Sequence, residues 1–274
     1  MTTYYLVGVI EIMNDSTKDL NLQIKGKIII NADDFGYDEA HTMGILKAFK
    51  DGLISNATVM VNMPHFDEAC VLSEKYGIKD RIGLHLNLVE GVPLTEGIKR
   101  CSTFCDANGI MHGLWRQSIW KTTFLTKKER ELLRQEIVAQ FSLFEQKGFS
   151  LRHFDTHGHA HTYFSVWNII ASVLKAKSEP YNVRIAKNLF DCNAYGLRAL
   201  YKRMMNVVIP RKMHCSGFFT DIKGYLHNAL LLDEYSVTEI MCHPCLVDGS
   251  IFNPDDLQLT ELKQHRPQWE ISRF

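Results

Sequence analysis

The sequence predicts an α/β protein with a distorted (β/α) barrel that is TIM-barrel-like and has fewer than eight regular strands. Two observations predict this fold class. Short apolar runs rich in β-branched residues alternate at least five times with helix-like segments along the 274 residues, a pattern typical of a largely parallel sheet with helices on its faces. Acidic and histidine side chains fall at or near the ends of four strand-like runs, where barrel proteins keep their chemistry.

The first part of the chain contains an extension and three expected strands. Residues 1–26 precede the first strand and are expected to form an N-terminal extension, either an added edge strand or an extended arm. Asp51-Gly52 and Gly77 follow segments with helix-like spacing and are typical helix ends. The expected strands are 27–31, 56–62 and 81–88, and the expected helices are 38–50 and 64–76.

Residues 91–124 interrupt this regular pattern. Gly, Pro, Cys, Asn and Trp residues follow one another there without a clear period. A long irregular insertion in a compact enzyme is often a substrate-binding loop, and a lid or a partner contact is the alternative. We expect residues 27–274, including this insertion, to form a single barrel domain.

The second part of the chain returns to alternation. Thr126 is a typical N-cap, and apolar residues at heptad-like spacing after it predict an amphipathic helix that ends at Gly148. The stretch 188–220 has the least regular pattern, with one expected helix and a strand expected near Val207. The expected helices are 126–147, 165–177, 194–205 and 221–232, and the expected strands are 152–155, 181–185 and 237–241.

Charge and cysteine content limit the function classes and the compartment. The 31 basic residues balance 31 acidic ones, so the net charge gives no sign of adhesion to nucleic acid or to an anionic membrane. No stretch is long and apolar enough to span a bilayer, and residues 4–10 lack the flanks of a signal peptide. The seven cysteines are odd in number and irregularly spaced, which argues against a secreted disulfide framework and favours the cytoplasm.

Two adjacent carboxylates, Asp33 and Asp34, end the first strand-like run. Neighbouring carboxylates repel each other unless a cation or a shared proton relieves them, so the pair suggests a metal ligand beside a base. A turn or a helix cap is the alternative, because Asp is common in both. On this stretch alone the turn or cap is the better interpretation, and the histidines further on reverse it.

Histidines lie at three further strand ends: His85, the run from His157 to His161, and His243. A lone histidine is more often a satisfied, partly buried residue than a ligand, and a histidine-rich run can bind metal adventitiously. All four polar clusters lie at or near strand ends, which favours a shared site. Imidazole with carboxylate is a common ligand set for a catalytic divalent metal. Only some of the three histidines in the run can reach one ion.

Four motifs occur in order between residue 27 and at least residue 244. They are Asn31-Ala32-Asp33-Asp34-Phe35-Gly36, Gly83-Leu84-His85-Leu86-Asn87, His153-Phe154-Asp155-Thr156-His157-Gly158-His159-Ala160-His161 and Glu239-Ile240-Met241-Cys242-His243-Pro244. Together they resemble the YdjC/ChbG family of carbohydrate deacetylases. The resemblance implies a distorted barrel, a bound divalent metal, and removal of the acetyl group from an N-acetylated sugar.

Carried over position by position, the resemblance implies roles for five residues. Asp34, His85 and His157 match the metal-binding positions of the family. Asp33 matches the base, and His243 stands where related deacetylases place a histidine that protonates the leaving amine. These five side chains are the candidate metal ligands and catalytic groups.

Four further residues are candidates for contacts with the substrate or with the ligands. Arg184 resembles a family position that could orient Asp33. Asp155 lies two residues before His157 and is expected to orient a histidine. His159 and His161 complete this set.

Three positions depart from the family pattern. Gly158 stands where Gln or His is common, Ala160 where Val is common, and Cys245 where glycine is usual. The changes at Gly158 and Ala160 are toward smaller side chains and are expected to widen the site. They bear on the substrate more than on the reaction.

The expected cofactor is one divalent metal ion, Mg or Zn. Two imidazoles and one carboxylate suit zinc among other ions, while the family is often associated with magnesium. The expected partner is an N-acetylated sugar, and the apolar part of the N-terminal extension is a candidate contact for a homodimer. The alternatives are another metal-dependent barrel hydrolase, either an amidohydrolase or a phosphoesterase, and a non-catalytic sugar-binding relative. The presence of both a base and an acid argues against pure binding.

Overall fold

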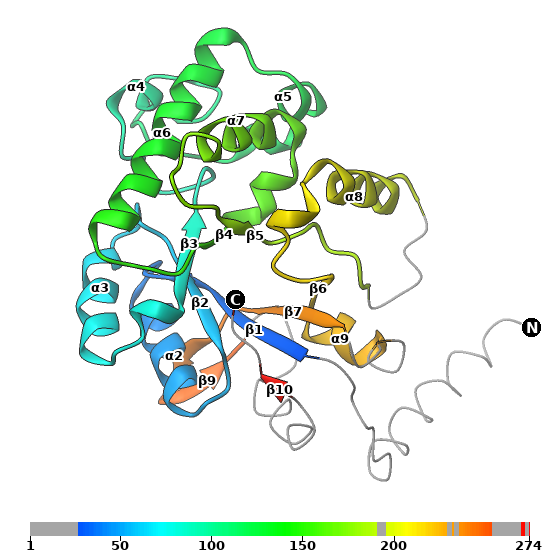
Figure 1. Cartoon of the computed structure of the whole chain (residues 1–274). Helices are drawn as coiled ribbons and strands as arrows, with labels where there is room; N and C mark the ends of the chain where they lie inside the picture. Colours follow the sequence, from blue (N-terminus) through cyan, green and yellow to red (C-terminus); the bar gives the residue numbers. More distant parts are fainter. Residues whose placement is uncertain (1–26, 191–195, 229–231, 233–235, 254–269, 272–273) are drawn as a thin grey trace, which may run out of the picture.

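The fold is a curved parallel sheet with helices around its outer side (Figure 1). The computed structural model describes residues 27–190, 196–228, 232, 236–253, 270–271 and 274, so the expected N-terminal extension lies outside the described residues. Seven parallel strands follow one another across the sheet in the order β5-β4-β3-β2-β1-β7-β6. The strands are β1 (Lys27–Phe35), β2 (Asn56–Val59), β3 (Ile82–Leu86), β4 (His153–Thr156), β5 (Asn182–Val183), β6 (Phe218–Asp221) and β7 (Val237–Cys242).

The two edge strands of this sheet approach each other, which curls the sheet into a barrel. The backbone N–H of Cys215 donates to the carbonyl of Val183 at 3.4 Å, and that of Asn188 donates to the carbonyl of Phe219 at 3.2 Å. These bonds connect the two edges without lengthening β5 or β6. The prediction of a distorted barrel with fewer than eight regular strands is confirmed. Outside the seven-strand path, β10 (Glu270–Ile271) pairs with β1.

Helices follow the strands, and the side chains of capping residues stabilise the first turn of some of them. Asp38 caps α2 (Glu39–Lys50), and its carboxylate accepts the N–H of His41 at 2.8 Å. Thr126 and Glu129 form a capping box at α6 (Lys127–Gln146), which satisfies N–H groups that have no partner inside the helix. The other barrel helices are α3 (Phe66–Lys75), α7 (Phe164–Leu174), α8 (Leu197–Val208) and α9 (Ile222–Asn228), and a hairpin of β8 (Cys245–Val247) and β9 (Ser250–Phe252) packs on α2.

In the last third of the chain one expected strand was wrong and one strand was missed. The strand expected near Val207 does not form, because α8 continues to Val208 and buries Met205. The helix expected from residue 221 forms and begins one residue later, at Ile222, but the sequence analysis missed the strand before it, β6, which has four residues and is too short to show a period. Residues 194–195 and 229–231, near the ends of two expected helices, lie outside the described residues.

Residues 91–124 pack against the end of β3 and contain two short helices, α4 (Glu96–Lys99) and α5 (Ile119–Thr123). Phe104 and Trp115 are buried, and the indole N–H of Trp115 donates to the carbonyl of Leu88 at 3.2 Å. The insertion is therefore a packed element with its own short helices.

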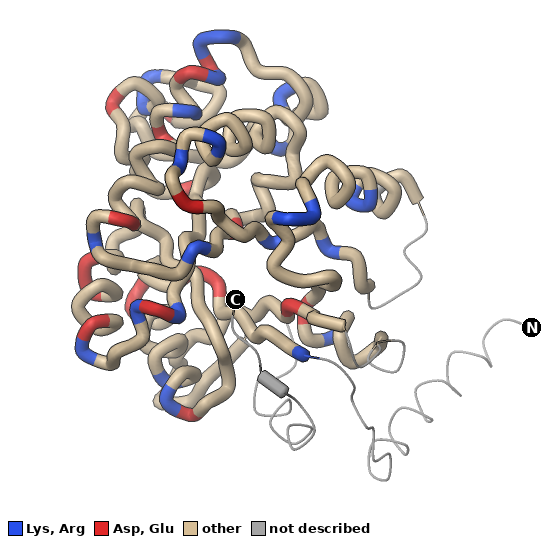
Figure 2. The backbone as a smooth tube through the Cα atoms, in the orientation of Figure 1, with Lys and Arg blue, Asp and Glu red and all other residues tan. Residues whose placement is uncertain are grey.

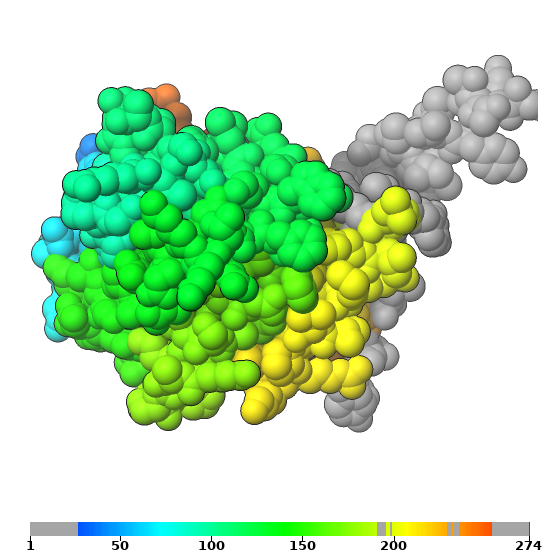
Figure 3. Space-filling model, turned by 90° about the horizontal axis from the view of Figure 1, so that it is seen from above, coloured from blue at the N-terminus to red at the C-terminus, as the bar shows by residue number. Residues whose placement is uncertain are grey.

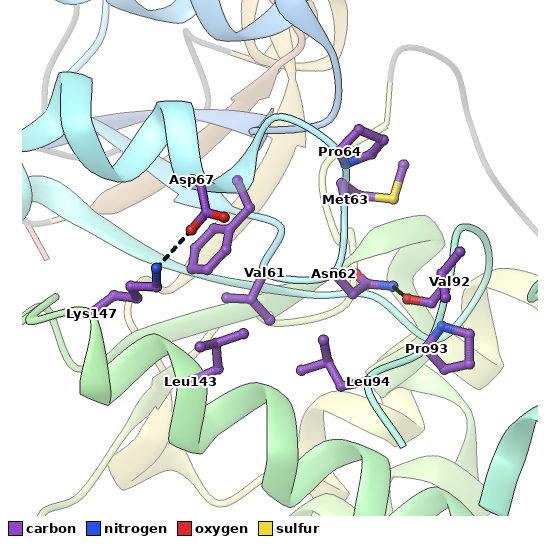
Figure 4. A pocket seen from close by; sticks show the side chains of 11 residues that line it. Val61, Asn62, Met63, Pro64, Asp67, Val92, Pro93, Leu94, Leu143 and Lys147 are labelled. Carbon is purple, nitrogen blue, oxygen red and sulfur yellow. Dashed lines mark hydrogen bonds and ion pairs between the residues drawn. The ribbon is translucent and has the colours of Figure 1, made fainter. Parts of the chain in front are cut away.

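A surface pocket of about 520 Å³ lies where the start of this insertion meets α6 and the loop after β2 (Figure 4). Apolar side chains such as Val61 and Leu143 line it, and the ion pair between Lys147 and Asp67, at 2.7 Å, lies beside them. None of the candidate site residues from the sequence lines this pocket. It is separate from the site described next.

Candidate metal centre and catalytic groups

Asp33 and Asp34 both reach the site because β1 contains a bulge. Side chains alternate between the faces of a regular strand, so neighbouring residues normally point apart. Between Ala32 and Phe35, β1 has one residue more than the facing segment of β2, and Asp34 adopts a left-handed backbone with φ of 68°. The bulge re-aims one of the two side chains, which explains how adjacent carboxylates contact the same group of residues.

Three predicted metal ligands meet at one point. Oδ1 of Asp34 lies 3.1 Å from Nε2 of His85 and 3.0 Å from Nδ1 of His157. The two imidazole nitrogens are 3.4 Å apart. One carboxylate oxygen and two ring nitrogens thus face a common centre, and this cluster could hold a metal ion.

The second nitrogen of each imidazole is held by a carboxylate. Nδ1 of His85 lies 2.6 Å from Oδ1 of Asp155, and Nε2 of His157 lies 2.6 Å from Oε1 of Glu90. Such outer carboxylates fix the orientation and tautomer of metal-binding histidines. Asp155 was expected to orient a histidine, and the histidine that it contacts is His85, not His157, which follows it by two residues.

Arg184 joins three buried carboxylates beneath this cluster. Its guanidinium contacts Asp33 at 2.5 and 2.7 Å, Asp155 at 2.7 Å and Glu239 at 2.6 Å. All four side chains are at least 98% buried. Arg184 thus holds Asp33 in the bidentate geometry that carboxylates and guanidinium groups favour, which is the contact expected from the sequence.

The charges of these residues shift one another's pKa values. Burial raises the pKa of Asp33, but the charge of Arg184 and its hydrogen bonds outweigh burial and hold that pKa well below its usual value. Burial lowers the pKa of His85, but the charge of Asp155 and hydrogen bonds to Asp155 and Asp34 raise it to about 10. Burial likewise lowers the pKa of His157, and hydrogen bonds to Asp34 and Glu90 raise it to about 9.

The chemistry of this donor set fits a divalent cation. Three buried carboxyl groups, those of Asp33, Asp155 and Glu239, contact a single guanidinium, and a fourth, that of Asp34, lies between the two imidazoles beside them. The excess negative charge must be offset, because unpaired charges are costly to bury. Protonated imidazoles offset it in the metal-free state, and a divalent ion with neutral imidazoles would offset it equally well.

His243 lies beside Asp33 at the end of β7. Its Nε2 is 4.0 Å from Oδ2 of Asp33, and its side chain is 18% exposed. The backbone N–H of His243 donates to Oδ1 of Asn253 at 2.8 Å. The structure therefore brings the predicted acid and the predicted base together. Both lie next to the cluster of Asp34, His85 and His157, here called the metal-type cluster.

The two other histidines of the run point elsewhere. Residues 157–162 form a short kinked segment, η3 (His157–Thr162), in which Gly158 and His159 have positive φ angles. Nδ1 of His161 lies 2.7 Å from Oγ1 of Thr156, and the His159 ring packs edge-on against Phe219. Of the three histidines, only His157 belongs to the cluster with Asp34 and His85.

The space beside Gly158 is occupied. A Cβ added at Gly158 would lie 1.9 Å from a guanidinium nitrogen of Arg116, which comes from the insertion. The same nitrogen donates to the carbonyl of Gly158 at 3.4 Å. A glycine at this position therefore admits Arg116, and the expectation that it widens the site does not hold at this point.

Glu90 and Asn31 belong to the site, although the sequence analysis gave them no role. Glu90 also accepts the hydroxyl of Tyr37 at 3.2 Å. The amide of Asn31 donates to Asp33 at 2.8 Å and to Thr58 at 3.1 Å. Glu90 comes shortly after the end of β3, and Asp33 and Asp34 lie at the end of β1. A search for acidic residues at and just after strand ends would therefore have found Glu90 as well.

Fold and site together define a class: α/β-barrel proteins with a carboxylate and imidazole cluster, able to hold a metal, at the C-terminal ends of the strands. Within this class the chain belongs to the YdjC-like family, whose model matches residues 27–273. The resemblance inferred from the four motifs is therefore confirmed.

Relatives with assigned functions match most of the chain. A carbohydrate deacetylase of Vibrio parahaemolyticus is 31% identical over 232 residues, covering 81% of this chain and 79% of its own. One of Brevibacillus brevis is 27% identical over 243 residues, covering 86% and 90%. A solved structure from Enterococcus faecalis V583, a proposed cellobiose-phosphate cleavage protein, has a TM-score of 0.62 at 23% identity and covers 82% of this chain and 83% of its own. This last likeness concerns the fold.

Proposed function

We propose that this protein is a metal-dependent carbohydrate deacetylase, which hydrolyses the amide of an N-acetylated sugar or oligosaccharide. One observation carries the proposal: a carboxylate within the metal-type cluster, Asp34, lies next to a second carboxylate outside it, Asp33, whose Oδ2 lies 4.0 Å from Nε2 of His243. Amide hydrolysis needs these groups, because water is a poor nucleophile and an amine a poor leaving group near neutral pH. The relatives named carbohydrate deacetylases support the choice of substrate class.

The ion would be held by Asp34, His85 and His157, and we propose Mg or Zn. A divalent ion there would polarise the acetyl carbonyl and lower the pKa of a nearby water by several units. Asp155 and Glu90 keep the ligand nitrogens turned toward the ion.

Asp33 is the proposed base. Its contacts with Arg184 and Asn31 fix the carboxylate, and its lowered pKa keeps it ionised at neutral pH, ready to accept a proton from the attacking water. His243 is the proposed acid, which gives a proton to the leaving nitrogen. The 4.0 Å between His243 and Asp33 lets both act on the same substrate group.

His243→Ala is expected to lose amide turnover and to keep its metal. General acids typically contribute about 10²–10⁴-fold to rate, and the loss should fall in that range for an N-acetylated sugar. A good leaving group needs no acid, so hydrolysis of p-nitrophenyl acetate should be nearly unchanged. Equal losses on amide and ester would remove His243 from the role of acid.

Metal binding is expected to release protons and to tighten as pH rises. The pKa values of about 10 and about 9 for His85 and His157 mean that both imidazoles are protonated at neutral pH in the metal-free protein. Ligand nitrogens must be neutral, so binding displaces up to two protons and affinity falls by up to about a hundredfold per unit as pH decreases. Calorimetry in buffers of different ionisation enthalpy counts these protons. Equal affinity at about pH 6 and about pH 8 would contradict this assignment.

Acetate release tests the function itself. The purified chain is incubated with N-acetylated mono- and oligosaccharides, after metal removal and reloading with Mg or Zn, and acetate is measured enzymatically. Release of acetate that depends on metal supports the proposal. Phosphate or ammonia released from other substrates, with no acetate, would assign the site to a phosphoesterase or an amidohydrolase instead.

We also place the enzyme in the cytoplasm. The six cysteines of the described residues are free thiols, which is compatible with a reducing compartment.

A further inference from the structure

Two helices near the site expose large apolar side chains. On α8, Leu197, Leu200, Met204 and Val207 are 49 to 86% exposed and recur at intervals of three and four residues, so they form a stripe along one side of the helix. On α5 and its end, Ile119, Trp120 and Phe124 are 66 to 75% exposed. Large exposed apolar patches on soluble domains mark interaction sites.

Both helices form hydrogen bonds with residues 162–165, which follow the histidine run. The hydroxyl of Tyr201, on α8, donates to the carbonyl of Thr162 at 2.9 Å, and the hydroxyl of Ser165 donates to the carbonyl of Lys121, on α5, at 2.9 Å. Phe164 lies between these two anchors and is itself 40% exposed. Figure 3 shows side chains of the green and yellow segments side by side on the upper face of the molecule. The apolar surface of α5, Phe164 and α8, here called the α5–α8 surface, therefore includes a residue that follows His157 by seven positions and the end of η3 by two.

This surface is basic, although the chain as a whole is neutral. Residues 107–128 contain four Lys or Arg and no Asp or Glu, and residues 192–220 contain five and none. Figure 2 accordingly shows blue but no red along α5 and α8. Of the two flanking acids, Asp221 pairs with Lys187, whereas Glu129 pairs with Lys121 of α5 and offsets one of these basic charges. The whole sequence is neutral, yet these two segments have an excess of basic residues.

We propose that the α5–α8 surface docks on an anionic lipid bilayer. Exposed Trp, Phe, Leu and Ile side chains beside Lys and Arg are the combination that lies in a membrane interface, where apolar groups enter the acyl boundary and basic groups meet anionic headgroups. A second copy of this chain is disfavoured as occupant, because a two-fold contact would set the same basic surface against itself. The contact is peripheral: no helix among the described ranges is long and apolar enough to cross a bilayer.

Docking would place the site next to the membrane surface. This step rests on the deacetylase function proposed above. The substrate is then an N-acetylated sugar that is carried on a lipid. The sugar would extend from the bilayer past Phe164 toward His157, along the segment that α5 and α8 hold in place.

Vesicle sedimentation of the full chain tests the docking. Phosphatidylcholine vesicles with added phosphatidylglycerol should bind the protein, and phosphatidylcholine vesicles alone should bind it weakly. Trp120→Ser with Leu200→Ser should lower the bound-to-free ratio at least about tenfold. Arg203→Gln, in α8, or Lys212→Gln, four residues after the end of α8, should lower it roughly fivefold each on anionic vesicles. The matched control is Val71→Ser with Tyr76→Ser, which removes two exposed apolar side chains from the region of α3 and should bind like the unchanged protein.

Several outcomes would overturn the docking proposal. They are equal binding to neutral and anionic vesicles, equal binding of the Trp120/Leu200 variant and its control, and a homodimer in solution that the Trp120/Leu200 changes dissociate. A second assay separates this proposal from the deacetylase function. Acetate release from a lipid-linked N-acetylglucosamine in anionic vesicles should fall about tenfold or more in the Trp120/Leu200 variant, while release from the free sugar stays unchanged. Absence of acetate from both carriers would defeat the deacetylase function, and sedimentation would still decide the docking.

Discussion

Asp34→Asn is expected to lose the metal, whereas Asp33→Asn keeps the metal and loses turnover. Oδ1 of Asp34 is the oxygen that faces both ligand nitrogens, and an amide oxygen is neutral and a poorer ligand. Asn tolerates a positive φ, so the bulge of β1 should survive the change. Metal affinity should fall by more than the roughly 10–100-fold that loss of an outer-shell partner causes. Turnover should fall with it.

For Asp33→Asn the loss lies in the chemical step. Asp33 contacts Arg184 and Asn31 but contributes no atom to the Asp34, His85 and His157 cluster. Removing the base should lower kcat by about 10²–10⁴-fold with the metal content unchanged. Metal analysis and kcat on one N-acetylated sugar measure both effects, and Asp51→Asn, a surface carboxylate paired with Lys47, is the matched control. If both variants stayed loaded and active, the division of roles between the two acids would be wrong.

Much of the fold could be predicted because the strands and helices of a barrel give the sequence a simple, alternating pattern. Strands such as β1 and β3 are buried on both faces, so they appear as apolar runs, and the site residues follow them at one end of the sheet. Asp34, His85 and His157 converge for this topological reason. The position of each along its strand is enough to bring them to the same edge of the barrel.

Other features depend on geometry that no local pattern encodes. The bulge at Asp34 is a one-residue slip against β2, visible only when the two strands are paired. Glu239 looks like an ordinary residue of β7, yet it is one of three carboxylates on Arg184. Arg116 reaches Gly158 across 42 residues of sequence. Such contacts depend on which elements pack together, so composition and spacing alone could not predict them.

Arg184→Met is expected to cause the largest loss of stability. The change leaves Asp33, Asp155 and Glu239 buried without their shared cation. Removing one partner from a buried ion pair typically costs about 3–5 kcal/mol, and here three partners are affected. Urea unfolding of the metal-free protein should show a loss in that range at neutral pH. Arg152→Met, which removes a partly exposed arginine paired with Glu179, should cost less than about 1 kcal/mol.

The pH dependence of this loss distinguishes charge from packing. Arg184 holds the pKa of Asp33 well below its ordinary 3.8, so the stability from this pair is present above about that pH and is lost as pH falls toward the lowered value. The difference between Arg184→Met and the unchanged protein should therefore be largest near neutral pH and should shrink as pH falls below about 3.8, because the unchanged protein then loses the stability that the Arg184–Asp33 pair supplies. Arg184→Lys keeps the positive charge but lacks the planar guanidinium, so its stability should lie between that of Arg184→Met and that of the unchanged protein. A deficit that stays constant with pH would mean that Arg184 stabilises the barrel through packing and not through the charges of Asp33, Asp155 and Glu239.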